Sequence, residues 1–112
     1  LREFEGVQRR FQERHTIRDI LIIDDYAHHP REIEATLQAA KSGWDRRVIA
    51  VFQPHRYTRV RDLMDEFFRC FYQADKLIVT DIYPAGERPI EGINAKKLYE
   101  GILRHGHRDV HY

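Results

Sequence analysis

Apolar residues along this 112-residue chain alternate between short continuous runs and longer stretches with helical spacing. Short runs rich in Ile, Leu and Val lie at 19–24, 47–52 and 76–81, and such runs are typical of buried strands in a parallel sheet. A looser alternation over 8–17 predicts an edge strand on the N-terminal side. The residues 110–112 predict the start of a further strand.

Helical spacing separates these strands. The first predicted helix begins at Pro30 and ends at Ser42-Gly43, the second covers 60–71, and the third is capped by Asn94 and stops near Gly106. The apolar positions that we expect to be buried follow the spacing i, i+3, i+4 most closely in the second helix. They are Ile33, Leu37, Ala40, Val60, Leu63, Met64, Phe67, Phe68, Phe71, Leu98 and Ile102.

The predicted order is strand, helix, strand, helix, strand, helix, strand. Such alternation favours an α/β fold with a parallel-rich sheet, right-handed crossovers and helices on both faces. In that fold the run 19–24 is expected to be a central parallel strand, because it is apolar on both faces.

Composition is that of an ordinary globular domain, and 1–112 is expected to be a single domain with one modest core. The formal net charge is +1, so no broad basic field attracts nucleic acid, and the apolar runs are too short to span a membrane. The lone Cys70 cannot form an internal disulfide and is expected to pack rather than react. These features favour a cytoplasmic protein without a nucleic-acid or membrane partner. Because the sequence begins at Leu1 and ends within a predicted strand, we expect a piece of a longer protein.

The turn after the second apolar run carries a concentration of cationic side chains: His55, Arg56, Arg59 and Arg61. A helix N-terminus presents free N–H groups and the positive end of the helix dipole, so cations there are mildly unfavourable unless an anion is bound. Arginine forms paired hydrogen bonds with a carboxylate or a phosphate. We therefore expect Arg56 and Arg59 to hold a small anion. A solvated helix start, with Arg61 paired to Asp65, is the alternative.

Polar loops follow three of the predicted strands, at 24–29, 54–61 and 83–87. The carboxyl ends of parallel strands meet at one edge of a sheet, where ligands bind in open α/β folds. We therefore expect the three loops to lie near one ligand.

The loop 24–29 combines two carboxylates with two histidines. Asp24 or Asp25 would suit a ribose hydroxyl or a hydrated Mg²⁺ ion, and His28 could donate to a phosphate or a developing oxyanion. A structural loop, with Asp25 as a turn residue and both histidines solvated or capping, is the competing interpretation. His28 and His29 are adjacent and point in different directions, which disfavours a zinc site, and no metal ligand is assigned.

Three motifs occur in a fixed order at these strand ends. They are D-D-Y-A-H-H-P at 24–30, F-Q-P-H-R-Y-T-R at 52–59 and D-I-Y-P-A-G-E at 81–87. Together they resemble the C-terminal domain of the Mur ligase family, and R-R-F-Q at 9–12 resembles the family's entry into that domain. The resemblance covers nearly the whole chain, and the order and spacing of the motifs make it specific.

The resemblance implies a Rossmann-like fold and an ATP-dependent amide ligase of peptidoglycan synthesis. In such an enzyme ATP phosphorylates the carboxylate of UDP-N-acetylmuramate, and the amino group of L-alanine attacks the acyl phosphate. By similarity, His28 would be the catalytic residue and Asp24 and Asp25 would lie near the nucleotide. The side chains that would bind L-alanine are those of Tyr26, His28, His55, Arg56 and Arg59.

One departure limits what this chain can do alone. No G-x-x-x-x-G-K-[S/T] phosphate loop occurs in it. The family carries that loop, the Mg²⁺ ligands and the UDP-sugar pocket in preceding central and N-terminal domains. The resemblance thus implies that 1–112 is most of a C-terminal domain that docks on the central domain of the same chain. ATP and Mg²⁺ would be bound mainly by that central domain, and the fragment alone would be inactive.

Two other classes of function fit parts of the pattern. A phosphate- or nucleic-acid-binding module would use 55–61 on phosphate groups and would bind with a steep salt dependence. A small metallophosphoesterase would use Asp24, Asp25, His28 and His29 and would show metal-dependent phosphatase activity.

Overall fold

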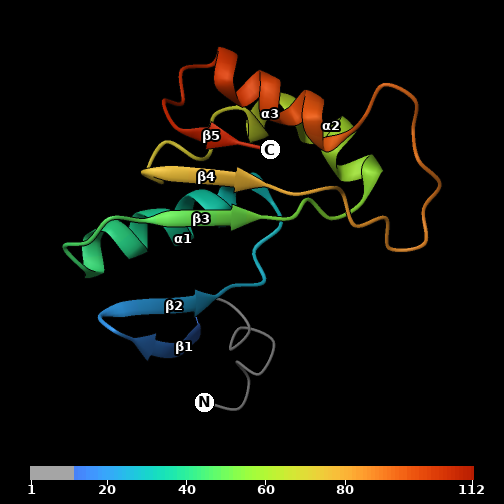
Figure 1. The fold of residues 1–112 in the computed structure, drawn as a ribbon. Coiled ribbons are helices and arrows are strands. Elements are labelled where there is room, and N and C mark those ends of the chain that lie inside the picture. The colour runs from blue at the N-terminus through green and yellow to red at the C-terminus, as the bar shows by residue number, and fades with distance from the viewer. Residues whose placement is uncertain (1–11) are drawn as a thin grey trace.

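The structure, a computed structural model, describes residues 12–112 and contains two separate sheets (Figure 1). The smaller sheet pairs β1 (Gln12–Ile17) with β2 (Ile20–Asp24) in antiparallel fashion. The larger sheet is parallel, in the order β3 (Ile49–Phe52), β4 (Lys76–Val79) and β5 (Val110–His111). The helices are α1 (Pro30–Gly43), α2 (Tyr57–Phe67) and α3 (Ala95–Arg104). The predicted α/β fold with a parallel sheet is confirmed.

One face of the larger sheet forms the core. The register places Ala50 beside Leu77, and Phe52 beside Val79, so these side chains point to the same face. Phe52, Leu77 and Val79 are buried in one cluster with apolar residues of all three helices. The rings of Phe52 and Phe71 lie 5.1 Å apart within this cluster.

Among the described residues no helix covers the opposite face of β3, which differs from the expected helices on both faces. Ile49 and Val51 point away from the core and are 53% and 67% exposed. The connections β3–α2–β4 and β4–α3–β5 step in the same direction across the sheet. Right-handed crossovers that step in one direction place their helices on the same face, which accounts for the one-sided cover.

The ends of the helices follow local capping chemistry. Pro30 begins α1 after a capping box formed by His29 and Glu32, and the Asn94 side chain accepts a hydrogen bond from the Lys97 N–H at the start of α3. The helix α2 begins and ends earlier than the predicted 60–71, and the chain turns after Phe67. Phe71 therefore packs in the core from outside the helix.

The prediction of a central parallel strand over 19–24 is wrong. Arg18 and Asp19 adopt positive φ angles of 49° and 70°, so the chain folds back at once and β2 pairs with β1. Turns with two positive φ angles match the twist of a tight hairpin, which explains the antiparallel pairing. The predicted edge strand at 8–17 is found as β1, and residues 8–11 lie outside the described residues, as does most of the R-R-F-Q segment.

A concavity of about 290 Å³ separates the hairpin from the larger sheet. Leu21 and Ile23 of β2 line one side, and residues 46–52 line the other along β3. Within the described residues, no helix has both the length and the apolar character needed to cross a membrane.

Candidate functional site

The three polar loops meet at the carboxyl ends of the strands, as the sequence predicted. The ring centroids of His28 and His55 lie 6.2 Å apart, and those of His55 and Tyr83 lie 5.4 Å apart. The backbone also joins two of the loops, because the Arg56 N–H donates to the Tyr83 carbonyl at 2.8 Å. Although β2 is not part of the larger sheet, the loop after it reaches the same edge.

An open concavity of about 610 Å³ lies between the first loop and the start of α2. It contains all five side chains that the sequence suggested for amino-acid binding, together with three that it did not. The lining residues are Tyr26, His28, His55, Arg56, Thr58, Arg59, Asp62 and Leu63. Asp62 and Leu63 follow Arg59 at helical spacing, and Thr58 lies three residues after His55, which is the signal that could have identified them.

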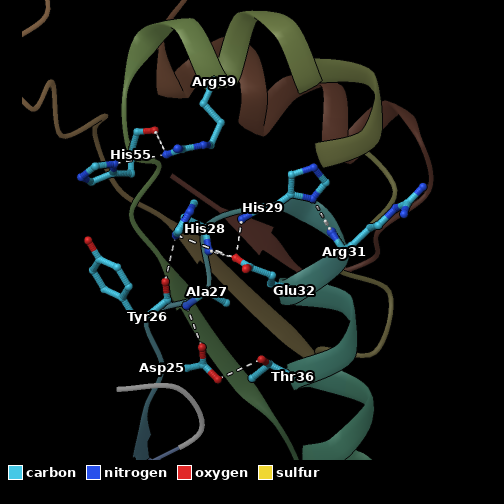
Figure 2. Close-up of polar contacts among 10 residues, drawn as sticks. All are labelled: Asp25, Tyr26, Ala27, His28, His29, Arg31, Glu32, Thr36, His55 and Arg59. Atoms are coloured by element: carbon cyan, nitrogen blue, oxygen red, sulfur yellow. Dashed lines mark hydrogen bonds and ion pairs between the residues drawn. The ribbon is translucent and has the colours of Figure 1, made fainter. Parts of the chain in front are cut away.

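Arg59 is held against His55 (Figure 2). Its Nη1 donates to the His55 carbonyl at 3.1 Å and lies 3.2 Å from His55 Nδ1. Because a guanidinium can only donate, His55 Nδ1 is an acceptor and the ring proton lies on Nε2. Burial, followed by the positive charges of Arg59 and Arg56, lowers the pKa of His55. His55 is therefore a neutral imidazole at pH 7 that presents an N–H group.

His28 has the opposite arrangement. Its Nδ1 lies 3.1 Å from the Tyr26 carbonyl, which can only accept, so Nδ1 carries a proton. The His28 backbone N–H donates to Glu32 Oε1 at 3.2 Å, and the Tyr26 ring packs edge-on against the imidazole at 5.6 Å. When His28 is neutral, its Nε2 thus carries a lone pair. One concavity contains an imidazole that accepts and an imidazole that donates.

His29 and Asp25 have structural roles, as the competing interpretation of this loop proposed. His29 Nδ1 accepts from the Arg31 N–H at 3.1 Å and caps α1 (Figure 2). Asp25 Oδ1 accepts from the Ala27 N–H at 2.7 Å, and Oδ2 accepts from the Thr36 hydroxyl at 2.9 Å.

The donor set of this loop does not fit a bound Mg²⁺ ion. Both oxygens of Asp25 bond within the protein, and Asp24 and Asp25 line the concavity beside β2 rather than the one that contains the arginines. Across residues 12–112, no group of three or more His, Cys, Asp or Glu side chains is placed to hold a metal ion. Because His29 and Asp25 already form hydrogen bonds within the protein, the phosphoesterase alternative is also weakened.

The anion at the N-terminus of α2 is an internal carboxylate, which the sequence reasoning missed. Glu87 Oε1 accepts from the Thr58 N–H at 3.1 Å, and Oε2 accepts from the Thr58 hydroxyl at 2.5 Å. The expectation that a ligand would use the free N–H groups of this helix is therefore corrected: one of these groups bonds to Glu87. The alternative pairing of Arg61 with Asp65 is also wrong, because Arg61 Nε donates to Asp62 at 2.8 Å.

Comparisons with known proteins match the chain to a known family. Residues 9–112 match the Mur ligase family, glutamate ligase domain. The chain is 64% identical over 98% of its length to a UDP-N-acetylmuramate–L-alanine ligase of Syntrophotalea carbinolica, and 62% identical over 97% to that of Geotalea uraniireducens. In each case it spans 24% of the relative's length. A murein peptide ligase from Psychrobacter arcticus has a similar structure, with a TM-score of 0.67 and 27% identity over 92% of this chain and 22% of the other.

Proposed function

Because this chain belongs to the Mur ligase family, we propose that it is the amino-acid-binding domain of an ATP-dependent ligase that joins L-alanine to UDP-N-acetylmuramate. The observation that carries this proposal is the concavity in which two guanidinium groups lie beside two imidazoles of opposite polarity. An amino acid has a carboxylate that suits the first pair and an amino group that suits an imidazole lone pair. The proposed product is an amide of peptidoglycan synthesis.

Arg56 and Arg59 hold the carboxylate of L-alanine in this proposal. Arg59 is fixed by its bonds to His55, so little side-chain entropy is lost when the ligand binds. The Nε2–H of His55 adds a third donor, and the low pKa of His55 keeps the ring neutral, so that a further positive charge does not crowd the arginines.

His28 receives the proton of the amino group. The ammonium group of an amino acid must lose a proton before it can attack an acyl phosphate, and an imidazole is suited to accept that proton near neutral pH. The bond from His28 Nδ1 to the Tyr26 carbonyl fixes the tautomer with the lone pair on Nε2. Tyr26 supports this orientation by packing against the ring.

The remaining parts of the reaction belong to other parts of the protein in this proposal. ATP supplies the phosphoryl group that activates the muramate carboxylate, and ATP, Mg²⁺ and UDP-N-acetylmuramate are bound by central and N-terminal domains. Residues 1–112 form most of the C-terminal domain, dock on the central domain of the same chain and do not catalyse ligation alone. We assign the protein to the cytoplasm, where ATP and nucleotide sugars occur.

The test is Arg56→Ala in the complete enzyme. We expect the KM for L-alanine to rise about tenfold to a hundredfold, because a charge-assisted hydrogen bond contributes about 1.5–3 kcal/mol, while the KM for ATP stays nearly unchanged. Arg56→Lys should also be impaired, because lysine keeps the charge but loses the planar fork. Steady-state kinetics on purified variants measure both constants.

Arg69→Ala is the matched control. Arg69 is an exposed arginine just beyond the end of α2. Its side chain pairs with Asp65 at 2.8 Å and does not line the concavity. Its removal should leave both KM values unchanged. An unchanged KM for L-alanine and an unchanged kcat in Arg56→Ala would show that Arg56 belongs only to a solvated helix start.

A further inference from the structure

The helix that carries the arginines begins without a cap of its own. The N-cap residue of α2 is Arg56, whose side chain makes no capping hydrogen bond, and the first turn of the helix contains no acidic residue. Helix N-termini usually carry Ser, Thr, Asp or Asn, because their first N–H groups lack partners within the helix. Arg56 also has a φ of 76°, a conformation that non-glycine residues rarely adopt. Something outside the helix must hold this segment.

Glu87 supplies the missing cap from 29 residues further along the chain. Its two carboxylate oxygens bond to the backbone N–H and the hydroxyl of Thr58, at 3.1 Å and 2.5 Å. The Thr58 hydroxyl, followed by the backbone N–H groups of Thr58 and Tyr57 and the charge of Arg56, lowers the pKa of Glu87. The carboxylate is therefore charged near pH 7 and lies at the positive end of the helix dipole.

The loop that contains Glu87 is itself tied to the strand end before Arg56. The Tyr83 N–H donates to the Pro54 carbonyl at 2.8 Å, and the Tyr83 carbonyl accepts from the Arg56 N–H at 2.8 Å. The Glu87 N–H donates to the Pro84 carbonyl at 3.0 Å, which closes the turn that carries Glu87. Arg56 is thus bonded through its own N–H on one side, and the helix that follows it is bonded to Glu87 on the other.

We propose that Glu87 is a positioning residue for amino-acid binding: by capping α2 it sets the backbone from which Arg56 and Arg59 reach the substrate carboxylate. This inference rests on the proposed function, and it gives the loop 83–87 a role in the site. It also explains why cationic side chains are tolerated at this helix start, since a fixed internal carboxylate offsets them. The substrate carboxylate is then bound by the guanidinium groups, while Glu87 occupies the Thr58 N–H.

The test compares Glu87→Ala and Glu87→Gln with wild type in the complete enzyme. Glu87→Ala should raise the KM for L-alanine about tenfold and leave the KM for ATP within about twofold, because the arginines lose their fixed positions. Glu87→Gln keeps the size and one acceptor oxygen and should show a smaller rise. Glu91→Ala, which removes an exposed acid from the following segment, is the control and should change neither constant.

A double-variant cycle separates positioning from a general loss of structure. Because Glu87 positions Arg56 as well as Arg59, the double variant Arg56→Ala/Glu87→Ala should raise the KM for L-alanine by clearly less than the product of the two single-variant factors. A double-variant KM that rises by the full product of the two single-variant factors would overturn the proposal. A Glu87→Ala enzyme with an unchanged KM for L-alanine would also overturn it.

A second measurement does not depend on the identity of the substrate. Amide hydrogen exchange at Thr58 should be faster in Glu87→Ala and Glu87→Gln than in wild type, and unchanged in Glu91→Ala. If the enzyme does not use L-alanine but Thr58 exchange responds as expected, the proposed function fails while the cap stands. Unchanged exchange at Thr58 in both Glu87 variants would overturn the positioning role.

Discussion

The hydrogen-bond partners of each histidine decide what its imidazole can do. His55 accepts from Arg59 and is left as a donor, whereas His28 donates to a carbonyl and is left as an acceptor. His107 is buried, with Nδ1 accepting from the Asp109 N–H and Nε2 within 3.1 Å of two carbonyl oxygens. Its two nitrogens are both used, so His107 is structural. Residue type alone therefore does not identify a site, but the partners on each ring nitrogen do.

Gly101 shows how closely α3 approaches the residue that follows α2. A Cβ atom at this position in α3 would lie 2.0 Å from Cε1 of Phe68, which is too close for any side chain. We expect Gly101→Ala to lower the free energy of unfolding by about 1–3 kcal/mol, because the Phe68 ring must leave its packed position. Urea denaturation of the two proteins measures the difference.

Gly43→Ala is the control for the Gly101 variant. Gly43 lies at the end of α1 with open space around the position of a Cβ atom. The exchange should change stability by less than about 1 kcal/mol, and in the stabilising direction if the backbone is unstrained. Equal effects of the two exchanges would contradict the steric explanation.

Local patterns in the sequence found Arg56 and Arg59 but not the group that holds them. The arginines follow a strand end and start a helix, and both signals lie within a few residues. Glu87 meets Thr58 through the packing of two loops, at a sequence separation of 29 residues. Periodicity carries no information at that distance, so a contact of this kind has to come from the structure.

At the scale of elements, the Asp75 carboxylate connects α1, β3 and β4. Asp75, just before β4, accepts from Lys41 Nζ of α1 at 2.8 Å and from the Val48 N–H beside β3 at 2.7 Å. The Asp75 N–H also donates to the Val48 carbonyl at 2.8 Å. The hydrogen bond from Lys41, and then the one from Val48, lowers the pKa of Asp75 in the folded state.

The lowered pKa of Asp75 predicts a pH-dependent contribution to stability. In the unfolded chain an Asp carboxyl has a pKa of about 3.9, so the stabilisation is present above that pH and is lost as the pH falls through the lower folded-state pKa. The difference in unfolding free energy between wild type and Asp75→Asn should therefore shrink below about pH 4. Urea denaturation at a series of pH values, with Asp45→Asn as a control acid, measures it. A difference that stays constant down to pH 2 would contradict this role.

Elements whose ends depend on neighbouring residues could be predicted, whereas the strand that pairs with the run 19–24 could not. The cap at Asn94 and the start of α1 at Pro30 needed only neighbouring residues, and both are found. The run 19–24 was correctly predicted as a strand, but its partner was assigned from its apolar character. The tight turn at Arg18 and Asp19 provides a nearer partner, so pairing followed the short connection rather than the long crossover.

At the scale of the molecule, the site and the core occupy different parts of the fold. The core lies between one face of the larger sheet and the helices, while the site residues lie on loops and on the first turns of α2, at the carboxyl edge of that sheet. This separation leaves the loop residues free to serve binding without weakening the core. It also leaves that edge open to a second domain, as the proposed composite site requires.

The strand β3 has a consequence of its own for how the chain behaves at high concentration. Within the described residues β3 is an outer strand of its sheet, and Ile49 and Val51 are exposed on the face away from the core. Outer strands with unpaired backbone groups and apolar side chains are templates for pairing with another chain. Of the charges that flank it, Arg46 is already engaged with the Asp19 carbonyl, at 2.7 Å.

When produced alone, the chain should therefore associate reversibly as its concentration rises, by adding strands side by side along β3. Val51→Lys should shift this association to higher concentration, because a lysine on an outer strand opposes pairing without touching the core. Sedimentation velocity over a concentration series compares the two proteins. Identical concentration dependence in both would place the association elsewhere on the surface. A neighbouring segment or domain that covered β3 would therefore keep copies of this domain apart.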